Sequence, residues 1–391
     1  MQLKENNHRA LSKHREEVLA RLRPGRPASR NDLARETGLS SATVSRIARA
    51  LVRQRVLTEL PASEPGVGRP VSALEVNGAY GSVVGVSLLA PLARLVLLSL
   101  RGEILREAEE PLDLARGPDA LLGSLRRLLR RVPRRPGRFC GTGLALPGQW
   151  SKEEGVSLMY PRLPAWKNVP LRKLLEEWTG GPAALIGYAP ALAVAEQARG
   201  GRPEPRNLLC AEVAENIALG VISNGEVLEG ASGNAGELGH VCMDPQGPVC
   251  YCGNRGCLES RATCSAVVDE VRSSPEARGR FPRPRAATFD EVVRLARDGD
   301  PFSVRLLGRT GRALGHGLAT ALNLFNPELL VLNGRFFEAG DFVLTPLRAA
   351  IQEHAITSTL KRLTIERSVL GPAAPALGAG LVAIREALRR M

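Results

Sequence analysis

Residues 236–259 read GELGHVCMDPQGPVCYCGNRGCLE and contain a set of four potential metal ligands. Nine, one and four residues separate the successive members of this set, which are His240, Cys250, Cys252 and Cys257. Three thiolates and one imidazole suit tetrahedral Zn²⁺, and four protein ligands leave no open coordination position for catalysis. The stretch therefore predicts a structural zinc site that holds an otherwise irregular, glycine-rich loop in place.

Other interpretations of these cysteines stay open. Cys242 is an alternative ligand, whereas Cys264 is expected to pack in the helix that follows. A set of unliganded thiols is a further interpretation. A redox role is disfavoured because the motif is C-x-C rather than C-x-x-C beside a βα unit. The seven cysteines of the chain do not indicate a disulfide framework in a protein expected to be cytoplasmic.

Strands and helices alternate on both sides of this loop. Apolar runs predict strands at 83–86, 93–100, 140–146, 183–186, 208–213, 217–223, 227–228, 329–332 and 363–369. Helical patterns cover 118–131, 171–178, 190–199, 303–325 and 375–389, and Thr288 with Glu291 forms a capping box that opens another helix. This alternation predicts an α/β fold in two lobes.

The N-terminal part of the chain has a different pattern, in which three helices precede two short strands. Helices are predicted at 8–22, 29–37 and 41–53, and the last two are capped by Ser29 and Ser40. Strands are predicted at 56–60 and 71–76, around a loop rich in glycine and proline. Three helices and a β-wing make a winged helix-turn-helix.

The segment GLSSATVSRIARAL (38–51) has the features of a DNA recognition helix: a short preceding turn, small residues at its N-terminus and a polar outer face. We expect Arg46 to reach a guanine edge or a phosphate, and Arg49 and Arg53 to meet phosphates. On the stiff wing loop, one arginine suits a minor-groove or backbone contact. The predicted DNA-binding residues are Ser41, Thr43, Ser45, Arg46, Arg49 and Arg69. A solvated amphipathic helix is the alternative.

The charge of the chain agrees with a polyanionic partner without requiring one. Lys and Arg number 53 against 40 Asp and Glu, which gives a net charge of +13 over 391 residues. Only six of the cationic residues are lysines, so a genome biased toward arginine explains the excess equally well. No apolar run reaches the roughly 18–20 residues that cross a bilayer, and the polar N-terminus lacks the centre of a signal peptide. We therefore expect a cytoplasmic protein with no membrane partner.

At this point the chain resembles the ROK family of repressors and sugar kinases over nearly its whole length. The segments GNAGELGH (233–240) and CYCGNRGCLE (250–259) resemble the zinc and sugar motif of that family. Further matching segments follow the family's order: Leu146-Pro147-Gly148, WKNVPL (166–171), NLFNPELLVLNG (323–334) and GAGLVA (378–383). The winged helix places the chain with the repressor-type members, such as regulators of xylose or N-acetylglucosamine use.

The resemblance implies a particular organisation. The fold would be a winged helix-turn-helix followed by a two-lobed, actin-like ATPase (ribonuclease H-like) domain with a sugar cleft and the zinc-bound loop. We expect the DNA-binding domain to cover 1–77 and the effector domain 78–391, with one lobe at 78–190 plus the C-terminal helix and the other at 191–375. The resemblance also implies a homodimer or tetramer, so that two DNA-binding domains would meet a pseudo-palindromic operator in double-stranded DNA.

The phosphate and catalytic segments of the family's kinases are altered in this chain. Their first phosphate loop carries an acid and a glycine pair, whereas Ser87 replaces the acid here and no glycine pair follows. In the second phosphate segment, Glu215 would repel a nucleotide phosphate. The stretch that should hold the catalytic aspartate reads Gly187-Tyr188-Ala189-Pro190, so no carboxylate is there to take a proton from a sugar hydroxyl. We therefore expect no enzyme activity, because phosphate positioning supplies most of the remaining catalysis in phosphoryl transfer.

The same comparison gives the expected ligand site. Glu237, His240 and Glu259 match positions that bind sugar hydroxyls in the family, and His240 would serve both zinc and sugar through its two nitrogens. Structural alternatives are that Glu237 only braces the zinc loop, that Glu259 caps the following helix, and that the cleft is vestigial. The effector is then a sugar or sugar-like molecule, a different small ligand, or absent.

Three functional hypotheses follow. The leading one is a sequence-specific transcriptional regulator of carbohydrate metabolism, usually a repressor in this family, whose effector changes the spacing of the two DNA-binding domains. The second is a sugar kinase fused to a DNA-binding domain, which the altered catalytic segments disfavour. The third is a ligand-independent DNA-binding regulator.

Overall fold

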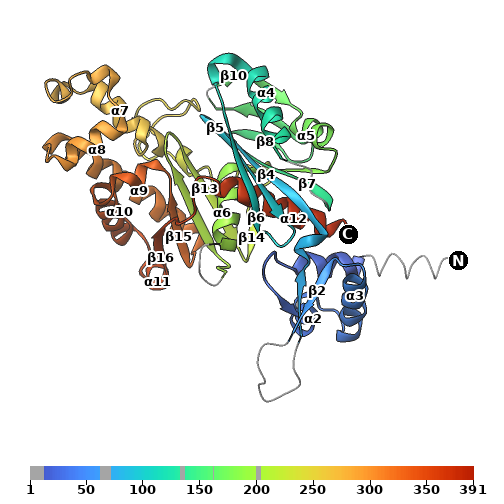
Figure 1. The fold of residues 1–391 in the computed structure, drawn as a ribbon. Coiled ribbons are helices and arrows are strands. Elements are labelled where there is room, and N and C mark those ends of the chain that lie inside the picture. Colours follow the sequence, from blue (N-terminus) through green and yellow to red (C-terminus); the bar gives the residue numbers. More distant parts are fainter. Residues whose placement is uncertain (1–12, 62–71, 133–136, 162, 200–203) are drawn as a thin grey trace. The chain divides into compact units, whose positions relative to one another are not determined.

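The structure is a computed structural model that describes residues 13–61, 72–132, 137–161, 163–199 and 204–391 (Figure 1). Internal contacts divide the chain into two units. Unit 1 comprises Met1–Ala191 with Pro372–Met391, and unit 2 comprises Leu192–Gly371. Among the described helices, none combines the length and the apolar character that a membrane span requires.

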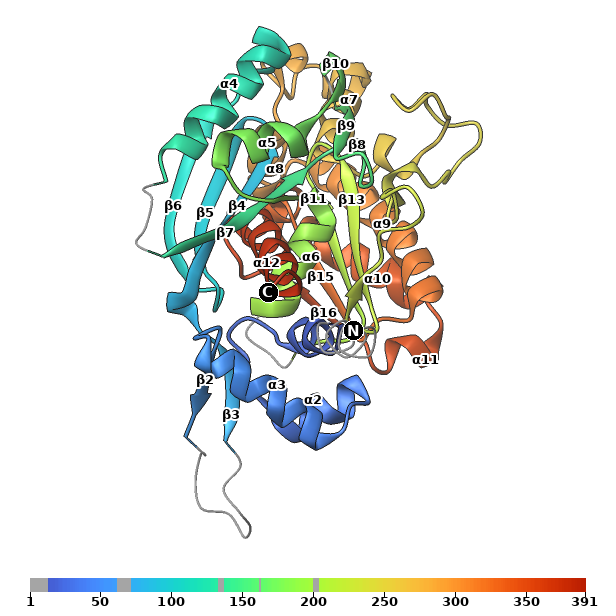
Figure 2. The same cartoon turned by 90° about the vertical axis from the view of Figure 1, so that its right-hand side faces the viewer.

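The N-terminal part of unit 1 is a helix-turn-helix with a small sheet (Figure 2). Residues 13–21 are helical in the described part of the predicted first helix, and α2 (Arg30–Thr37) and α3 (Ser41–Arg53) follow. The side chains of Ser29 and Ser40 accept hydrogen bonds from the backbone N–H of Asp32 and Thr43, so both predicted N-caps are confirmed. The strands pair in the order β1-β3-β2, with bounds Ala28–Ser29, Ala73–Val76 and Leu57–Leu60.

The remainder of unit 1 is built on a five-stranded sheet in the order β11-β7-β4-β5-β6. The bounds are Ala183–Gly187, Arg138–Leu146, Gly81–Leu89, Leu92–Ser99 and Ile104–Pro111. Alternate residues of β4 face opposite sides, as the period of a strand requires. Val84, Val86 and Leu88 belong to the core that includes residues of α4 (Gly117–Arg130) and α5 (Leu171–Thr179).

The opposite face of this sheet contacts α12 (Ala374–Arg389) at very short range. A Cβ added to Gly143 would lie 1.9 Å from the carbonyl oxygen of Ala379, and one added to Gly85 would lie 2.0 Å from that of Ala376. These two glycines therefore permit the close packing of α12 on β4 and β7. A separate antiparallel sheet runs β10-β9-β8, with bounds Leu163–Val169, Val156–Tyr160 and Gln149–Ser151.

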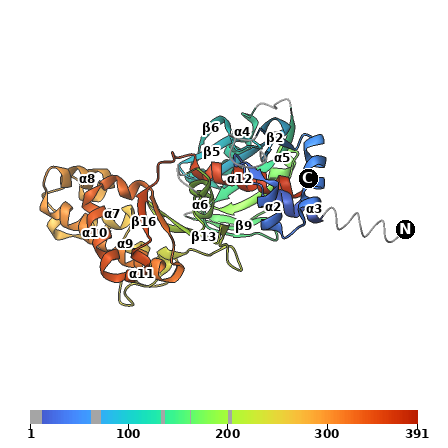
Figure 3. The same cartoon turned by 90° about the horizontal axis from the view of Figure 1, so that it is seen from below.

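Unit 2 contains a second five-stranded sheet, in the order β14-β13-β12-β15-β16. Its strands have the bounds Glu226–Val227, Ile217–Ser223, Leu208–Val213, Leu329–Asn333 and Thr364–Arg367. Strands β12, β15 and β16 are parallel, whereas β13 and β14 are antiparallel to their neighbours. The helices are α7 (Cys264–Ser273), α8 (Phe289–Arg297), α9 (Pro301–Phe325), α10 (Asp341–His354) and α11 (Thr357–Leu360), and they gather within this unit (Figure 3). Between the units the chain passes along α6 (Tyr188–Arg199).

The α/β architecture with an N-terminal helix-turn-helix is confirmed, and the predicted capping box is present because Thr288 accepts from the N–H of Glu291. The sequence analysis did not identify β6, the β8–β10 sheet or α10, whereas the helix expected after the cysteine loop is α7. Strand β6 (ILREAEEP) has exposed or half-buried residues at most positions, so it lacks the apolar run that marked the others. Helix α10 contains Pro346, a residue that normally interrupts a helical pattern.

Glu212, on β12, is expected to make the stability of unit 2 depend on pH. Burial raises the pKa of Glu212 to about 7 from an ordinary value of 4.5. Between these values the folded state binds more protons than the unfolded state, so the free energy of unfolding falls as the pH rises from 4.5 to 7. Glu212 keeps some contact with solvent, which reduces the expected size of the effect. We expect Glu212→Gln to remove about 1–2 kcal/mol of the fall in unfolding free energy between pH 4.5 and 7, measured by urea unfolding. Equal pH slopes in the variant and the unchanged protein would contradict the assignment.

Candidate functional site

The four predicted metal ligands come together in unit 2. The ligand atoms of His240, Cys250, Cys252 and Cys257 all lie within 4.8 Å of one another. The Sγ atoms of Cys252 and Cys257 are 3.7 Å apart, and the Sγ of Cys250 is 3.7 Å from Nδ1 of His240. Metal–sulfur bonds of about 2.3 Å in a tetrahedron place two sulfurs roughly 3.8 Å apart. The cluster therefore has the donor set and the spacing of a structural zinc site.

Backbone contacts shape the loop around these ligands. His240 ends the short turn η3 (Leu238–His240), and Cys257 immediately precedes η4 (Leu258–Ser260). The N–H of Cys250 donates to the carbonyl of Asn254 at 2.7 Å, which closes a turn that contains Cys252. Gly256 has φ +65°, and a Cβ there would lie 1.6 Å from the carbonyl oxygen of Asp244. Only glycine fits at this crossing of two loop strands.

The two other cysteines of the region have separate positions. Cys242 is exposed and does not belong to the four-residue cluster, although its backbone bridges to Cys257. Cys264 is buried at the first position of α7, which agrees with the prediction that it packs in the following helix. Of the alternatives for the ligand set, the geometry favours the one with His240.

The residues predicted to bind an effector lie beside the metal cluster. Because Nδ1 of His240 faces the sulfur of Cys250, its Nε2 points away from the cluster, 3.9 Å from the carboxylate of Glu237. Glu259 is 6% exposed and accepts from the backbone N–H of Ile217 at 2.8 Å and from the Asn216 amide at 3.1 Å. The cap of α7 is Thr263 rather than Glu259, so the alternative role of Glu259 as a helix cap is wrong.

Tyr251 is a member of this group that the sequence analysis missed. Its hydroxyl lies 3.2 Å from Nε2 of His240, and the two rings meet edge to face with centroids 5.3 Å apart. Although most of the Tyr251 side chain is exposed, partial desolvation of its hydroxyl and the negative charge of Glu259 raise its pKa, so the hydroxyl is protonated and can donate. The available signal was its position between two ligands in C-Y-C, which fixes its backbone whenever the metal is bound.

Three positions that depart from the kinase pattern are Ser87, Tyr188 and Glu215. Ser87 is buried within β4, and Tyr188 is the first residue of α6. Glu215 is engaged by the hydroxyl of Ser265 and lies 3.9 Å from Arg335, which also pairs with Asp290 at 2.6 Å.

Helix α3 presents the predicted arginines to solvent. Val44, Ile47, Ala48 and Leu51 are buried on one face of α3, whereas Arg46, Arg49 and Arg53 are exposed. Nε of Arg49 donates to the carbonyl of Ser45 at 3.2 Å, which draws this side chain back along the helix. Ser41 is exposed, and Thr43 and Ser45 are half-buried near its N-terminus. Arg69, the predicted wing contact, lies outside the described residues.

A helix-turn-helix joined to an α/β fold that holds a Cys₃His cluster defines a class of two-part proteins, in which a DNA-binding fold precedes a sugar-kinase-like fold. The chain belongs to the ROK family, whose model matches residues 84–386. An IclR helix-turn-helix domain matches residues 17–61. The xylose repressor of Bacillus spizizenii is 27% identical over 366 residues, which cover 93% of this chain and 92% of that protein.

Solved structures agree with this membership. A ROK family transcriptional regulator, described as a homolog of the E. coli MLC protein, superposes with a TM-score of 0.79 at 28% identity and covers 97% of each chain. The ROK hexokinase from Thermus thermophilus superposes with a TM-score of 0.63 at 31% identity, covering 77% of this chain and 97% of its own. Both regulators and kinases therefore occur among the similar structures.

Proposed function

We propose that this chain is a sequence-specific transcriptional repressor of carbohydrate metabolism that responds to a sugar or sugar-like effector. The observation that carries the proposal is the exposed arginine face of α3 within a helix-turn-helix fused to a ROK domain. Residues 1–77 form the DNA-binding domain and 78–391 the effector domain. Two copies in a homodimer or tetramer bind a pseudo-palindromic operator through the two recognition helices.

The DNA contacts divide by chemistry. Arg46 reads a base edge in the major groove, while Arg49 and Arg69 contact the backbone. Small side chains at the start of α3 allow its backbone to approach the floor of the groove; these are Ser41, Thr43 and Ser45. The positive end of the helix dipole favours a nearby phosphate. The net charge of +6 over residues 1–75, from 14 cations and 8 anions, supports this assignment.

The zinc ion is structural in this proposal and is held by His240, Cys250, Cys252 and Cys257. When bound, it supplies charge and fixed geometry rather than a reaction, because all four positions are occupied by protein. Coordination through Nδ1 of His240 would leave its Nε2 facing away from the metal. Glu237, Nε2 of His240 and Glu259 then offer hydrogen bonds to effector hydroxyls, with Tyr251 beside them.

The effector acts by differential affinity, since a ligand shifts an equilibrium only by binding one state more tightly. We propose that it changes the arrangement of the two DNA-binding domains. Kinase activity is the alternative, favoured by the similarity to the hexokinase. Ser87, Glu215 and Tyr188 stand against it, and sugar-dependent ATP turnover by the purified chain would support the alternative instead.

The deciding experiment is selection of bound genomic DNA fragments by the full chain, repeated with a panel of sugars that includes D-xylose. We expect enrichment of one pseudo-palindromic site whose occupancy changes with one sugar. No enriched site would reject sequence-specific binding. If one site is enriched but no sugar changes its occupancy, the proposal of sequence-specific DNA binding stands and the proposal of a sugar effector is rejected.

A substitution tests the effector residues. Glu237→Gln is preferable to a change at Glu259, because Glu237 caps no helix with its side chain and is half-exposed, whereas Glu259 holds the N–H of Ile217. Loss of a charged hydrogen bond should weaken binding of the sugar identified by that selection by about 10- to 100-fold, measured by calorimetry. Glu226→Gln, an exposed change on β14, is the matched control. Equal sugar affinity in both variants would remove Glu237 from the site.

A further inference from the structure

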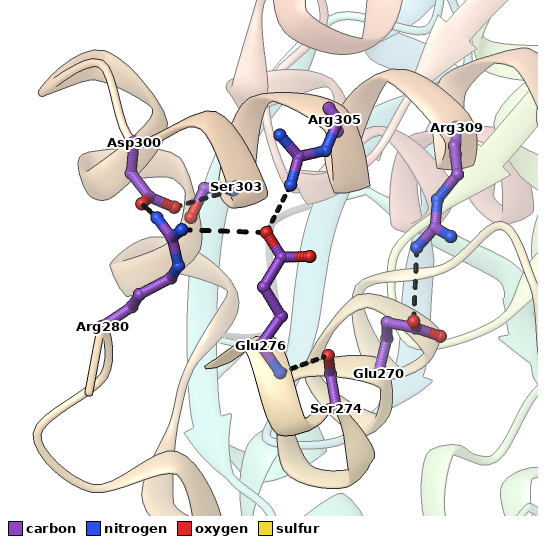
Figure 4. A network of polar contacts seen from close by, with 8 residues as sticks. All are labelled: Glu270, Ser274, Glu276, Arg280, Asp300, Ser303, Arg305 and Arg309. Carbon is purple, nitrogen blue, oxygen red and sulfur yellow. Dashed lines mark hydrogen bonds and ion pairs between the residues drawn. The ribbon is translucent and has the colours of Figure 1, made fainter. Parts of the chain in front are cut away.

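Unit 2 contains a pocket of about 640 Å³ between α9, α10 and the segment from α7 to the short turn η5 (Pro275–Ala277). Three arginines of α9 line it, namely Arg305, Arg309 and Arg312. Figure 4 shows Arg305 and Arg309 extending from α9 toward carboxylates of the facing segment. None of these residues belongs to the zinc cluster or to the proposed effector residues.

The arginines form a stripe along one helix face. Their spacing of four and three residues places them one above another on consecutive turns. Helix α9 contains no Asp or Glu in its 25 residues, so every partner comes from another element. Arg305 pairs with Glu276, Arg309 with Glu270 at 3.3 Å, and Arg312 with Glu353 at 2.7 Å. By contrast, Arg294 on α8 pairs locally, with the residue that caps the C-terminus of its own helix, Asp298, at 3.0 Å.

Gly308 is an independent indication that the pocket is a binding site, because the absence of a side chain there keeps the pocket unfilled. Gly311 and Gly315 of the same helix are required by packing, since a Cβ there would lie 2.4 Å from the Val343 carbonyl oxygen or 2.5 Å from that of Leu347. A Cβ on Gly308 would have no neighbour closer than the Cγ of Pro346, at 3.8 Å. A helix-interior glycine costs about 1 kcal/mol relative to alanine. Gly308 therefore keeps the pocket floor clear at a cost that packing does not explain.

We propose that this pocket binds a small dianion, either a phosphomonoester or a dicarboxylate, that carries a short carbon body. Each guanidinium has five donors, and the ion pairs above use one nitrogen of each. Exposed pairs of this kind contribute little stability, so a dianion can rearrange them at small cost. Guanidinium groups bind carboxylate and phosphate through paired, parallel hydrogen bonds, which a lysine ammonium cannot arrange.

The rest of the lining fits the body of such a molecule. Phe302, Pro346 and Ala349 supply apolar contacts, while Ser274 and Thr345 carry hydroxyl groups. The two carboxylates, Glu270 and Glu276, limit the net positive charge and accept hydrogen bonds from ligand hydroxyls. A bare polyanion such as a DNA backbone lacks the apolar body that this lining accommodates.

Helix α9 also connects the pocket to the zinc loop. Further along the helix, a Cβ on Gly317 would lie 2.3 Å from the Cδ2 of Leu258, so Leu258 packs directly onto the helix. Leu258 is the neighbour of Cys257 and Glu259 in sequence. A dianion that shifts α9 would therefore act on the loop that carries the metal ligands.

The test is calorimetric titration of the zinc-loaded full chain with glycerol phosphate and with malonate, at fixed ionic strength, with glycerol as the uncharged comparison. We expect saturable binding of at least one dianion tighter than about 1 mM and none of glycerol. Arg309→Gln should weaken it by about 10- to 100-fold. Gly308→Leu should weaken it comparably by filling the floor without changing the charge.

Two variants control for general anion binding by a basic chain. Arg294→Gln removes an exposed arginine of the same unit, and Arg46→Ala removes one of the DNA-binding domain; both should leave the affinity unchanged. The tighter probe identifies the phosphate or dicarboxylate source. Absence of saturable binding for both probes overturns the proposal, as does binding that Arg309→Gln leaves intact. If Arg309→Gln weakens dianion binding but Gly308→Leu does not, the dianion does not bind in this pocket.

Discussion

Cys257→Ser is expected to abolish zinc binding and to destabilise unit 2 by more than about 4 kcal/mol, the largest effect among these predictions. The Cys257 side chain is fully buried, and its sulfur lies 3.7 Å from that of Cys252. Removing this ligand breaks the tetrahedral set and releases the loop between η3 and η4. Zinc content by atomic absorption and the free energy of unfolding by urea denaturation should fall together.

Cys242→Ser is the matched control, because Cys242 is an exposed cysteine of the same loop outside the cluster. It should keep both the zinc content and the stability. A chelator should reproduce the effect of Cys257→Ser on the unchanged protein and have little further effect on the variant. If the purified, unchanged protein contains no zinc, or if both variants behave alike, the metal assignment is wrong.

Arg46→Ala should weaken operator binding by about 1–3 kcal/mol and relax the preference at one base position. Arg46 is exposed on α3. The helix is held in place by residues of its buried face, such as Val44 and Ile47, and not by packing of the Arg46 side chain. The loss should therefore appear in DNA affinity and leave thermal stability unchanged. Binding measured against a set of single-base operator variants separates loss of specificity from loss of charge.

Arg49→Ala gives the contrasting result within the same helix. A phosphate contact should weaken binding to all sequences alike and lower the salt dependence by about one unit of slope. Arg294→Ala, in unit 2, should change neither affinity nor slope. Unchanged affinity and base preference in Arg46→Ala would remove this residue from the set that reads the operator.

The helix-turn-helix and the metal ligands were predictable because both depend on short-range order. An N-cap acts within three residues, as Ser40 does on the N–H of Thr43, and a hydrophobic stripe such as Val44, Ile47 and Leu51 repeats within one helix. The ligands Cys250, Cys252 and Cys257 lie within eight residues, so their spacing alone restricts them to one site. The predicted α/β alternation rested on apolar runs that form buried strands regardless of their partners.

Other features depended on contacts between distant segments. Strand β10 has exposed residues at irregular positions and a register shift between Leu163 and Lys167, so no simple alternation marks it. The hydrogen bond from Asn216 to Glu259 spans 43 residues.

By itself, the sequence determined the class of fold, the helix caps, the candidate metal ligands and the face of α3 that meets solvent. The tertiary structure alone decided that Tyr251 meets the second nitrogen of His240 and that a side chain at Gly308 would meet no close neighbour beside an arginine stripe. The physical reason is that caps and periodicity are set by neighbours along the chain. Pockets and polar clusters are set by which helices and strands pack together, and that choice minimises the free energy of the whole unit.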